Sequence, residues 1–195
     1  MNPTELGTLD KLCKTIDPTG EKKMTDIYPT GLDLAVKLCT IWPYKNRLPA
    51  LDLMRILAVS PQAAAFSHPR GGNLIDVIIA GATEEEPPAP NHLMMALRAF
   101  ANLFLSEPGR TLALSEVTKI TSLIATAISP SKVDRNLLVA ATTVHINYAV
   151  LFTSSEASQN FEHILGMVDS LTKILVKEVD SEAVYRCVLV SFRFA

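Results

Sequence analysis

Several features that mark particular classes of protein are scarce in this chain. Its 195 residues include only three cysteines, Cys13, Cys39 and Cys187, which are odd in number and far apart. A disulfide framework is therefore not expected, and the thiols should be reduced and packed as small apolar groups. No run approaches the eighteen apolar residues that a membrane span needs, and the N-terminus lacks the apolar stretch of a signal sequence. We expect an intracellular protein without a membrane partner.

A large excess of charge of one sign is also lacking. Eighteen lysines and arginines stand against twenty acidic residues, which gives a formal net charge of −2. Such a balance excludes the global basic field that drives nonspecific binding to nucleic acid. We expect no nucleic-acid partner, and any basic site must be local.

Sequence patterns that mark metal sites, cofactor sites and enzymes are missing as well. The four histidines are scattered, and no pair of cysteines has the spacing of metal ligands. Phosphate-binding loops, dinucleotide fingerprints and the nucleophile elbow of hydrolases do not occur. A Cys–His nucleophile stays open, although no basic cluster surrounds a cysteine to lower the pKa of its thiol. We expect no metal, no cofactor and no enzymatic activity.

Apolar residues recur at helical spacing through nearly every segment, whereas the two-residue alternation of strands is missing. Breaks rich in Pro, Gly, Ser or charge separate the segments, among them 17–23, 106–110 and the exposed connector TEEEPPAP at 83–90. Asp134 and Ser115 are placed to cap the helices that follow them. The pattern predicts an all-α domain. The expected helices lie at 31–41, 48–60, 73–81, 91–105, 115–128, 134–152, 160–178 and 181–192.

A polar residue interrupts the apolar face of four of these segments at steps of 43, 45 and 43 residues. The four residues are Arg55, Arg98, Thr143 and Arg186. One turn further on, Asn102 and Asn147 are also 45 residues apart. A period of about 40 to 47 residues with two or three helices per unit is typical of armadillo and HEAT solenoids.

In such a solenoid the last helix of each repeat lines a concave surface. Residues four apart share a helix face, so Arg98 with Asn102, and Thr143 with Asn147, should point together into that concavity. An amide can donate to and accept from a peptide backbone, and a guanidinium presents forked donors to a carboxylate. The pattern predicts an extended, acidic peptide as the ligand.

Each residue of this column also has a structural interpretation. A single arginine in an amphipathic helix is most often solvated, and Arg55 could pair with Asp52 one turn earlier. His145, on another face of its helix, is expected to pack between helices. Three arginines in one column give a binding site the same weight as the structural interpretation, and both stay open at this point.

Four stretches, in this order, resemble the PUL domain, the C-terminal module of the phospholipase-activating protein family of ubiquitin-pathway adaptors. They are WPYKNRLPALDLMRILAV (42–59), NHLMMALRAFANLF (91–104), NLLVAATTVHINYAVLF (136–152) and DSEAVYRCVLV (180–190). The likeness covers about residues 28–190. We therefore expect an N-terminal helical extension at 1–27 and a PUL-like armadillo repeat domain at 28–195.

The resemblance implies a right-handed superhelical solenoid whose concave, basic groove holds the acidic C-terminal tail of the hexameric AAA segregase, also called valosin-containing protein. Arg55 matches the arginine after the family's Pro-Ala-Leu-Asp run, Arg98 that of its Ala-Leu-Arg run, and Arg186 that of its Tyr-Arg step. Asn102 and Asn147 would clamp the peptide backbone. The resemblance further implies a role in ubiquitin-dependent protein turnover in the cytoplasm and nucleus, with an indirect link to ubiquitylated substrates.

The chain also departs from the family pattern. The propeller and ubiquitin-binding module that usually precede this domain are not found, so ubiquitin binding is not carried over. After Arg186 the chain reads VLVSFRFA, with Phe192 where the family has glycine. We expect a truncated or altered final repeat with an uncapped apolar end, through which copies could self-associate. The alternative functions are a helical platform that binds no peptide, and a module appended to a thioredoxin-like or deubiquitinase-like domain.

Overall fold

The computed structural model describes residues 1–16, 27–67, 72–130, 132–154, 161–177 and 180–194. Within these ranges the regular structure is helical, apart from an isolated bridge between Ser67 and Asn73, which confirms the all-α prediction. The predicted break at 17–23 lies outside the described residues. The helices are α1 (Pro3–Ile16), α2 (Pro29–Ile41), the 3-10 helix η2 (Tyr44–Asn46), α3 (Leu48–Leu57), α4 (Pro61–Ala64), α5 (Leu74–Ala82), α6 (Pro90–Leu103), α7 (Glu107–Ser115), α8 (Val117–Ile128), α9 (Arg135–Ser154), α10 (Phe161–Lys177) and α11 (Ser181–Phe194).

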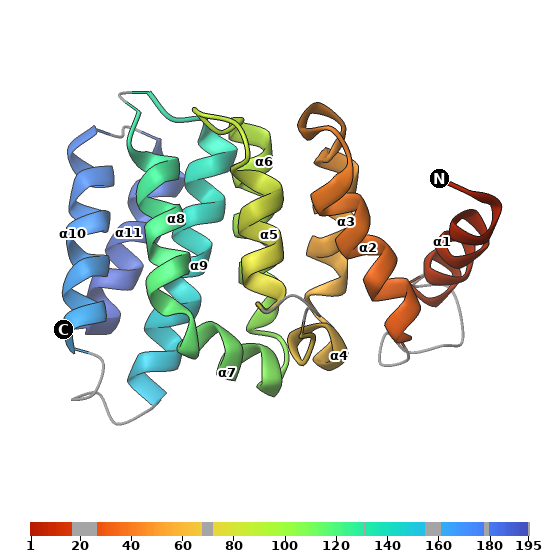
Figure 1. The fold of residues 1–195 in the computed structure, drawn as a ribbon. Coiled ribbons are helices and arrows are strands. Elements are labelled where there is room, and N and C mark those ends of the chain that lie inside the picture. Colours follow the sequence, from red (N-terminus) through yellow and green to blue (C-terminus); the bar gives the residue numbers. More distant parts are fainter. Residues whose placement is uncertain (17–26, 68–71, 131, 155–160, 178–179, 195) are drawn as a thin grey trace.

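The helices stack in two layers along the molecule (Figure 1). The inner layer consists of α3, α6, α9 and α11, each packed along the next. The outer layer consists of α2, α5, α8 and α10, while the short helices α4 and α7 pack together along one edge. Each repeat thus contributes one helix to each layer, which is the armadillo-like solenoid that the 43- to 45-residue period predicts.

Large apolar side chains fill the space between the layers. Met54 of α3, Phe100 of α6 and Phe152 of α9 are completely buried. Tyr148 is equally buried and donates its hydroxyl hydrogen to the carbonyl oxygen of Ala113 at 2.7 Å, which fastens α9 to α7. The core is therefore continuous from one repeat to the next, and it fixes the register of the inner helices.

The connector between α5 and α6 is exposed at its three glutamates, as predicted, but both of its ends are anchored. Tyr44 donates its hydroxyl hydrogen to the carbonyl oxygen of Ala82 and accepts from the amide of Ala89, both at 2.8 Å. The buried guanidinium of Arg47 forms an ion pair with Glu84 at 2.5 Å. These contacts hold the acidic connector against the start of the repeat stack.

Helices α4 and α7 were not predicted, and the break expected at 106–110 is wrong. Both helices begin after a capping serine with a proline in the first turn. The Oγ atoms of Ser60 and Ser106 accept from the amides of Gln62 and Gly109, each at 3.2 Å. A proline at the start of a helix costs no hydrogen bond, so these serine and proline residues begin helices and do not interrupt them.

The two capping predictions have opposite outcomes. Asp134 caps α9, because its Oδ1 accepts from the amide of Asn136 at 2.8 Å, as predicted. Ser115 does not begin a helix: it is the last residue of α7, and its hydroxyl donates to the carbonyl oxygen of Leu112 at 2.9 Å. Helix α8 follows after a single residue, Glu116.

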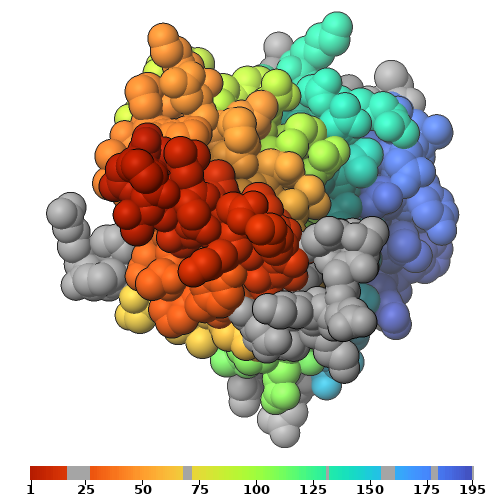
Figure 2. All heavy atoms as spheres, turned by 90° about the vertical axis from the view of Figure 1, so that its right-hand side faces the viewer, coloured from red at the N-terminus to blue at the C-terminus, as the bar shows by residue number. Residues whose placement is uncertain are grey.

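The two ends of the stack differ in character. At the N-terminal end, α1 lies across α2 (Figure 2). Most of the exposed residues of α1 are polar. At the other end, α10 and α11 leave a stripe of large apolar side chains exposed. The stripe includes Phe161, Leu165, Tyr185, Leu189 and Phe192.

Helix α9 has the length and apolar composition that would suffice to cross a membrane, although inspection of the sequence found no such run. More than half of its most apolar window is buried inside the fold, between α6 and α11. Helices α7 and α8 taken together are also long and apolar enough to cross a membrane, but they are bent by 75° where they meet. Burial on both sides explains the apolar composition of α9 as that of the central helix of a stack.

Candidate functional site

The predicted polar column lies in register on the inner layer. Arg55, Arg98, Thr143 and Arg186 occupy α3, α6, α9 and α11 respectively, and each is half-buried. The column is continuous at one step, where Nη1 of Arg186 donates to Oγ1 of Thr143 at 2.8 Å across 43 residues. Since consecutive inner helices pack along one another, the 43- to 45-residue spacing places these side chains on one surface.

The two predicted asparagines join neighbouring helices of the same layer. Nδ2 of Asn102 donates to the carbonyl oxygen of Arg55 at 2.8 Å, and Nδ2 of Asn147 donates to that of Ala101 at 3.1 Å. Each amide therefore fastens its own helix to the preceding one. Because an amide has two N–H groups and an oxygen, each asparagine keeps further hydrogen-bonding capacity beyond this contact.

The three arginines of the column differ in their partners. Nε of Arg55 pairs with Asp52 at 2.7 Å, which is the structural pairing weighed from the sequence. Nε of Arg186 pairs with Glu182 at 2.6 Å. Arg98 makes no hydrogen bond or ion pair with any residue that the structure describes. The middle arginine is thus a half-buried guanidinium with its donors unused.

This arrangement favours an anionic ligand. A guanidinium binds a carboxylate through two parallel hydrogen bonds, which are stronger than hydrogen bonds between neutral groups. Partial burial reduces solvent screening of the charge of Arg98. On either side along the stack, Arg55 and Arg186 are positively charged but are held by carboxylates from their own helices. Among the three arginines, Arg98 of α6 is therefore the one whose guanidinium could bind a carboxylate of an acidic ligand without first losing a carboxylate of the chain itself.

The described residues contain no group of three or more His, Cys, Asp or Glu side chains that could hold a metal ion. Burial raises the pKa of the Cys39 thiol to about 12 and that of Cys187 to about 11, the opposite of what a thiolate nucleophile needs. Cys13 is exposed, so the expectation that it packs as an apolar group is wrong. His145 is buried between helices, as predicted.

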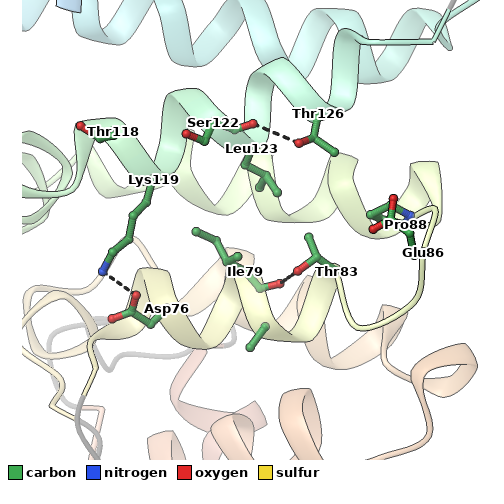
Figure 3. Close-up of a pocket in the computed structure, with 11 residues that line it drawn as sticks. Asp76, Ile79, Thr83, Glu86, Pro88, Thr118, Lys119, Ser122, Leu123 and Thr126 are labelled. Atoms are coloured by element: carbon green, nitrogen blue, oxygen red, sulfur yellow. Dashed lines mark hydrogen bonds and ion pairs between the residues drawn. The ribbon is translucent and has the colours of Figure 1, made fainter.

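A hollow that the sequence analysis missed lies between α5 and α8 of the outer layer (Figure 3). Asp76 and Lys119 form an ion pair at 2.6 Å at one end of it. A hydrogen bond from Lys119 lowers the pKa of the Asp76 carboxyl. The sequence could have indicated this pair, because Asp76 and Lys119 are 43 residues apart, which is an interval that also occurs in the arginine column.

Comparisons with known proteins identify the family of the chain. The family model of the PUL domain matches residues 1–190, and so includes helix α1. Phospholipase A-2-activating protein from Xenopus laevis is 25% identical over 189 residues, which cover 93% of this chain and 22% of that protein. The chain thus spans about a fifth of the length of this relative. The match over nearly the whole chain shows that it belongs to the PUL domain family.

Proposed function

We propose that the inner layer is a peptide-binding surface of an adaptor, and that its ligand is the acidic C-terminal tail of the hexameric AAA segregase, valosin-containing protein. The observation that carries the proposal is the half-buried guanidinium of Arg98, unpaired among the described residues and in register with two further arginines. Membership of the PUL domain family supports the adaptor role. In this proposal the protein acts in the cytoplasm and nucleus and reaches ubiquitylated substrates only through the segregase.

The arrangement of the column suggests how the tail would bind. A carboxylate of the ligand pairs with Arg98, while neighbouring carboxylates displace Asp52 from Arg55 and Glu182 from Arg186. Asn102 and Asn147 lie one turn from the column, where the second N–H or the oxygen of each amide can meet the peptide backbone. The ligand would therefore lie across the inner helices, along the axis of the stack.

Titration of a fluorescently labelled C-terminal decapeptide of the segregase, followed by anisotropy, tests this proposal. Binding should saturate and weaken as salt is raised, because the ion pairs are partly exposed. A peptide in which the acidic residues are replaced by their amides is the matched control, since it keeps length and shape and removes the charge. Equal binding of the two peptides would contradict the proposal.

The apolar stripe on α10 and α11 favours a second role, as a platform attached to further protein. Exposed apolar surface of this kind marks an association surface. The partner would be another helical repeat, in a second copy or in a larger protein of which this chain is one module. Light scattering after size-exclusion chromatography tests self-association: a dimer that Phe192→Glu converts to a monomer supports it, and a wild-type monomer at high concentration rules it out.

A further inference from the structure

The hollow between α5 and α8 is defined by equivalent residues of two successive repeats (Figure 3). It has a volume of about 580 Å³ and runs between the two helices from the Asp76–Lys119 ion pair to Glu86 and Pro88. Most of the lining residues repeat at the 43-residue interval, so Thr126 of α8 is equivalent to Thr83, which directly follows α5. We call this hollow the outer slot. It lies in the opposite layer from Arg98.

The outer slot is open because α5 and α8 do not pack closely against each other. Elsewhere in the outer layer α2 packs against α5, and α8 against α10, whereas α5 and α8 have few contacts with each other. Among the described residues, the polar bridges between the two helices lie at one end. Lys119 pairs with Asp76 at 2.6 Å and with Glu116 at 2.8 Å, and Nδ2 of Asn73 donates to Glu116 at 2.7 Å. The separation is thus built into the fold, and a ligand would not need to create it.

The interior of the outer slot is more apolar than its residue names suggest. Ile79 and Leu123 face each other across it (Figure 3). The hydroxyls of Thr83 and Thr126 are already used, since they donate to carbonyl oxygens of their own helices at 2.8 and 3.1 Å. Aliphatic side chains of a partner would therefore bury apolar surface here and leave few polar groups without a hydrogen bond.

The charges at the ends of the outer slot are predominantly acidic. The single lysine, Lys119, is already neutralised by Asp76 and Glu116. At the opposite end Glu86 is exposed and makes no hydrogen bond or ion pair within the described part of the chain, and Glu85 beside it is exposed too. The charge that complements this end of the outer slot is a cation.

We infer that the outer slot docks an amphipathic helix of a partner protein, with apolar side chains inserted between Ile79 and Leu123 and a lysine or arginine against Glu86. Helices bind grooves in this manner through anchors spaced three, four and seven residues apart. The outer slot's volume of about 580 Å³ lies in the range of about 300–1,000 Å³ that is usual for pockets that bind small molecules. This partner is basic, in contrast to the acidic ligand of the inner layer, so the domain would join two different proteins through opposite layers.

A synthetic helical peptide with leucines along one face and lysines at both ends is a suitable probe. It is titrated into the full chain labelled at isoleucine and leucine methyl groups, and binding is followed by NMR. Ser122→Phe fills the outer slot from an exposed wall position, and Glu86→Lys reverses the charge at its end. Glu162→Lys, an equal change of charge at the start of α10, is the control for general attraction. Arg98→Ala separates this site from the peptide surface of the inner layer.

The inference predicts saturable binding with shifts of the Ile79 and Leu123 methyl signals. Ser122→Phe and Glu86→Lys should weaken binding at least tenfold while unfolding at the wild-type temperature, and Arg98→Ala and Glu162→Lys should bind as the wild type does. Three results would overturn it: no saturable binding, an equal loss in Glu86→Lys and Glu162→Lys, or unchanged binding by a folded Ser122→Phe protein. Loss of segregase-tail binding in Arg98→Ala has no bearing on this result, so the two proposals can fail separately.

Discussion

The side-chain amide of Asn102 donates a hydrogen bond of 2.8 Å to the backbone carbonyl oxygen of Arg55, and so joins α6 to α3. Asn147 repeats this contact one repeat later, from α9 to the carbonyl oxygen of Ala101 in α6. Residues expected to serve a ligand therefore also hold the repeats together. Their substitution should affect stability as well as binding.

Replacing Asn102 with alanine should lower the free energy of unfolding by about 1–2 kcal/mol, because the carbonyl oxygen of Arg55 loses its partner in a partly buried position. Asn147→Ala should have a similar or slightly smaller effect, since its bond is longer at 3.1 Å. Urea denaturation measures both. Asn136→Ala, at an exposed position in the first turn of α9, should change stability by less than about 0.5 kcal/mol. Equal changes in the free energy of unfolding in all three variants would show that the hydrogen bonds between the helices do not stabilise the fold.

A glycine in α7 should not tolerate even one added carbon. A Cβ atom at Gly109 would lie 2.0 Å from the backbone oxygen of Leu103, which cannot move without disturbing the end of α6. Gly109→Ala should therefore destabilise the protein by about 2–3 kcal/mol. Gly7→Ala is the control, because nothing lies within 4 Å of its Cβ position. In the middle of α1 that change should stabilise by about 0.5–1 kcal/mol, and thermal denaturation would reveal the opposite signs.

Burial lowers the pKa of His145 to about 4, so the folded protein keeps this imidazole neutral. In the unfolded chain the same group is protonated below its ordinary pKa of about 6.5. Between these values the unfolded state binds more protons, so stability should decrease as the pH falls from 6.5 to 4, by about 3 kcal/mol from this residue.

The difference between variants isolates this effect from that of the carboxylates. His145→Gln should lose stability over this pH range by less than the wild type does, whatever its stability at neutral pH. Identical pH profiles for wild type and His145→Gln, measured by urea denaturation, would refute the assignment.

The helical class, the repeat period and the register of the inner layer could all be predicted from the sequence, because apolar spacing and one recurring polar position carry that information. Helices α4 and α7 could not be found by the same reasoning, which took proline and serine as breaks. The pattern that the sequence reasoning missed is Ser-Pro at the start of α4 and Ser-Glu-Pro at the start of α7, whose capping serines are 46 residues apart.

The partners of the site residues were beyond prediction for a different reason. The distinction between Arg98, which is unpaired among the described residues, and Arg186, which contacts both Glu182 and Thr143, depends on side-chain geometry across two helices. Helical spacing places residues on a face, but it does not decide which neighbour each guanidinium meets. The outer slot was missed because its depth depends on how far α5 and α8 stay apart.

The most direct test of the proposed function is titration of the labelled segregase tail peptide with the wild-type protein and three variants. Arg98→Ala should weaken binding tenfold or more, since a charge-assisted contact is worth roughly 1.5–3 kcal/mol. Arg98→Lys should retain part of the affinity, because it keeps the charge but loses the forked donors. Arg110→Ala removes an exposed arginine of α7, outside the column, and should bind normally. Unchanged binding by a folded Arg98→Ala protein, or an equal loss in Arg110→Ala, would contradict the account.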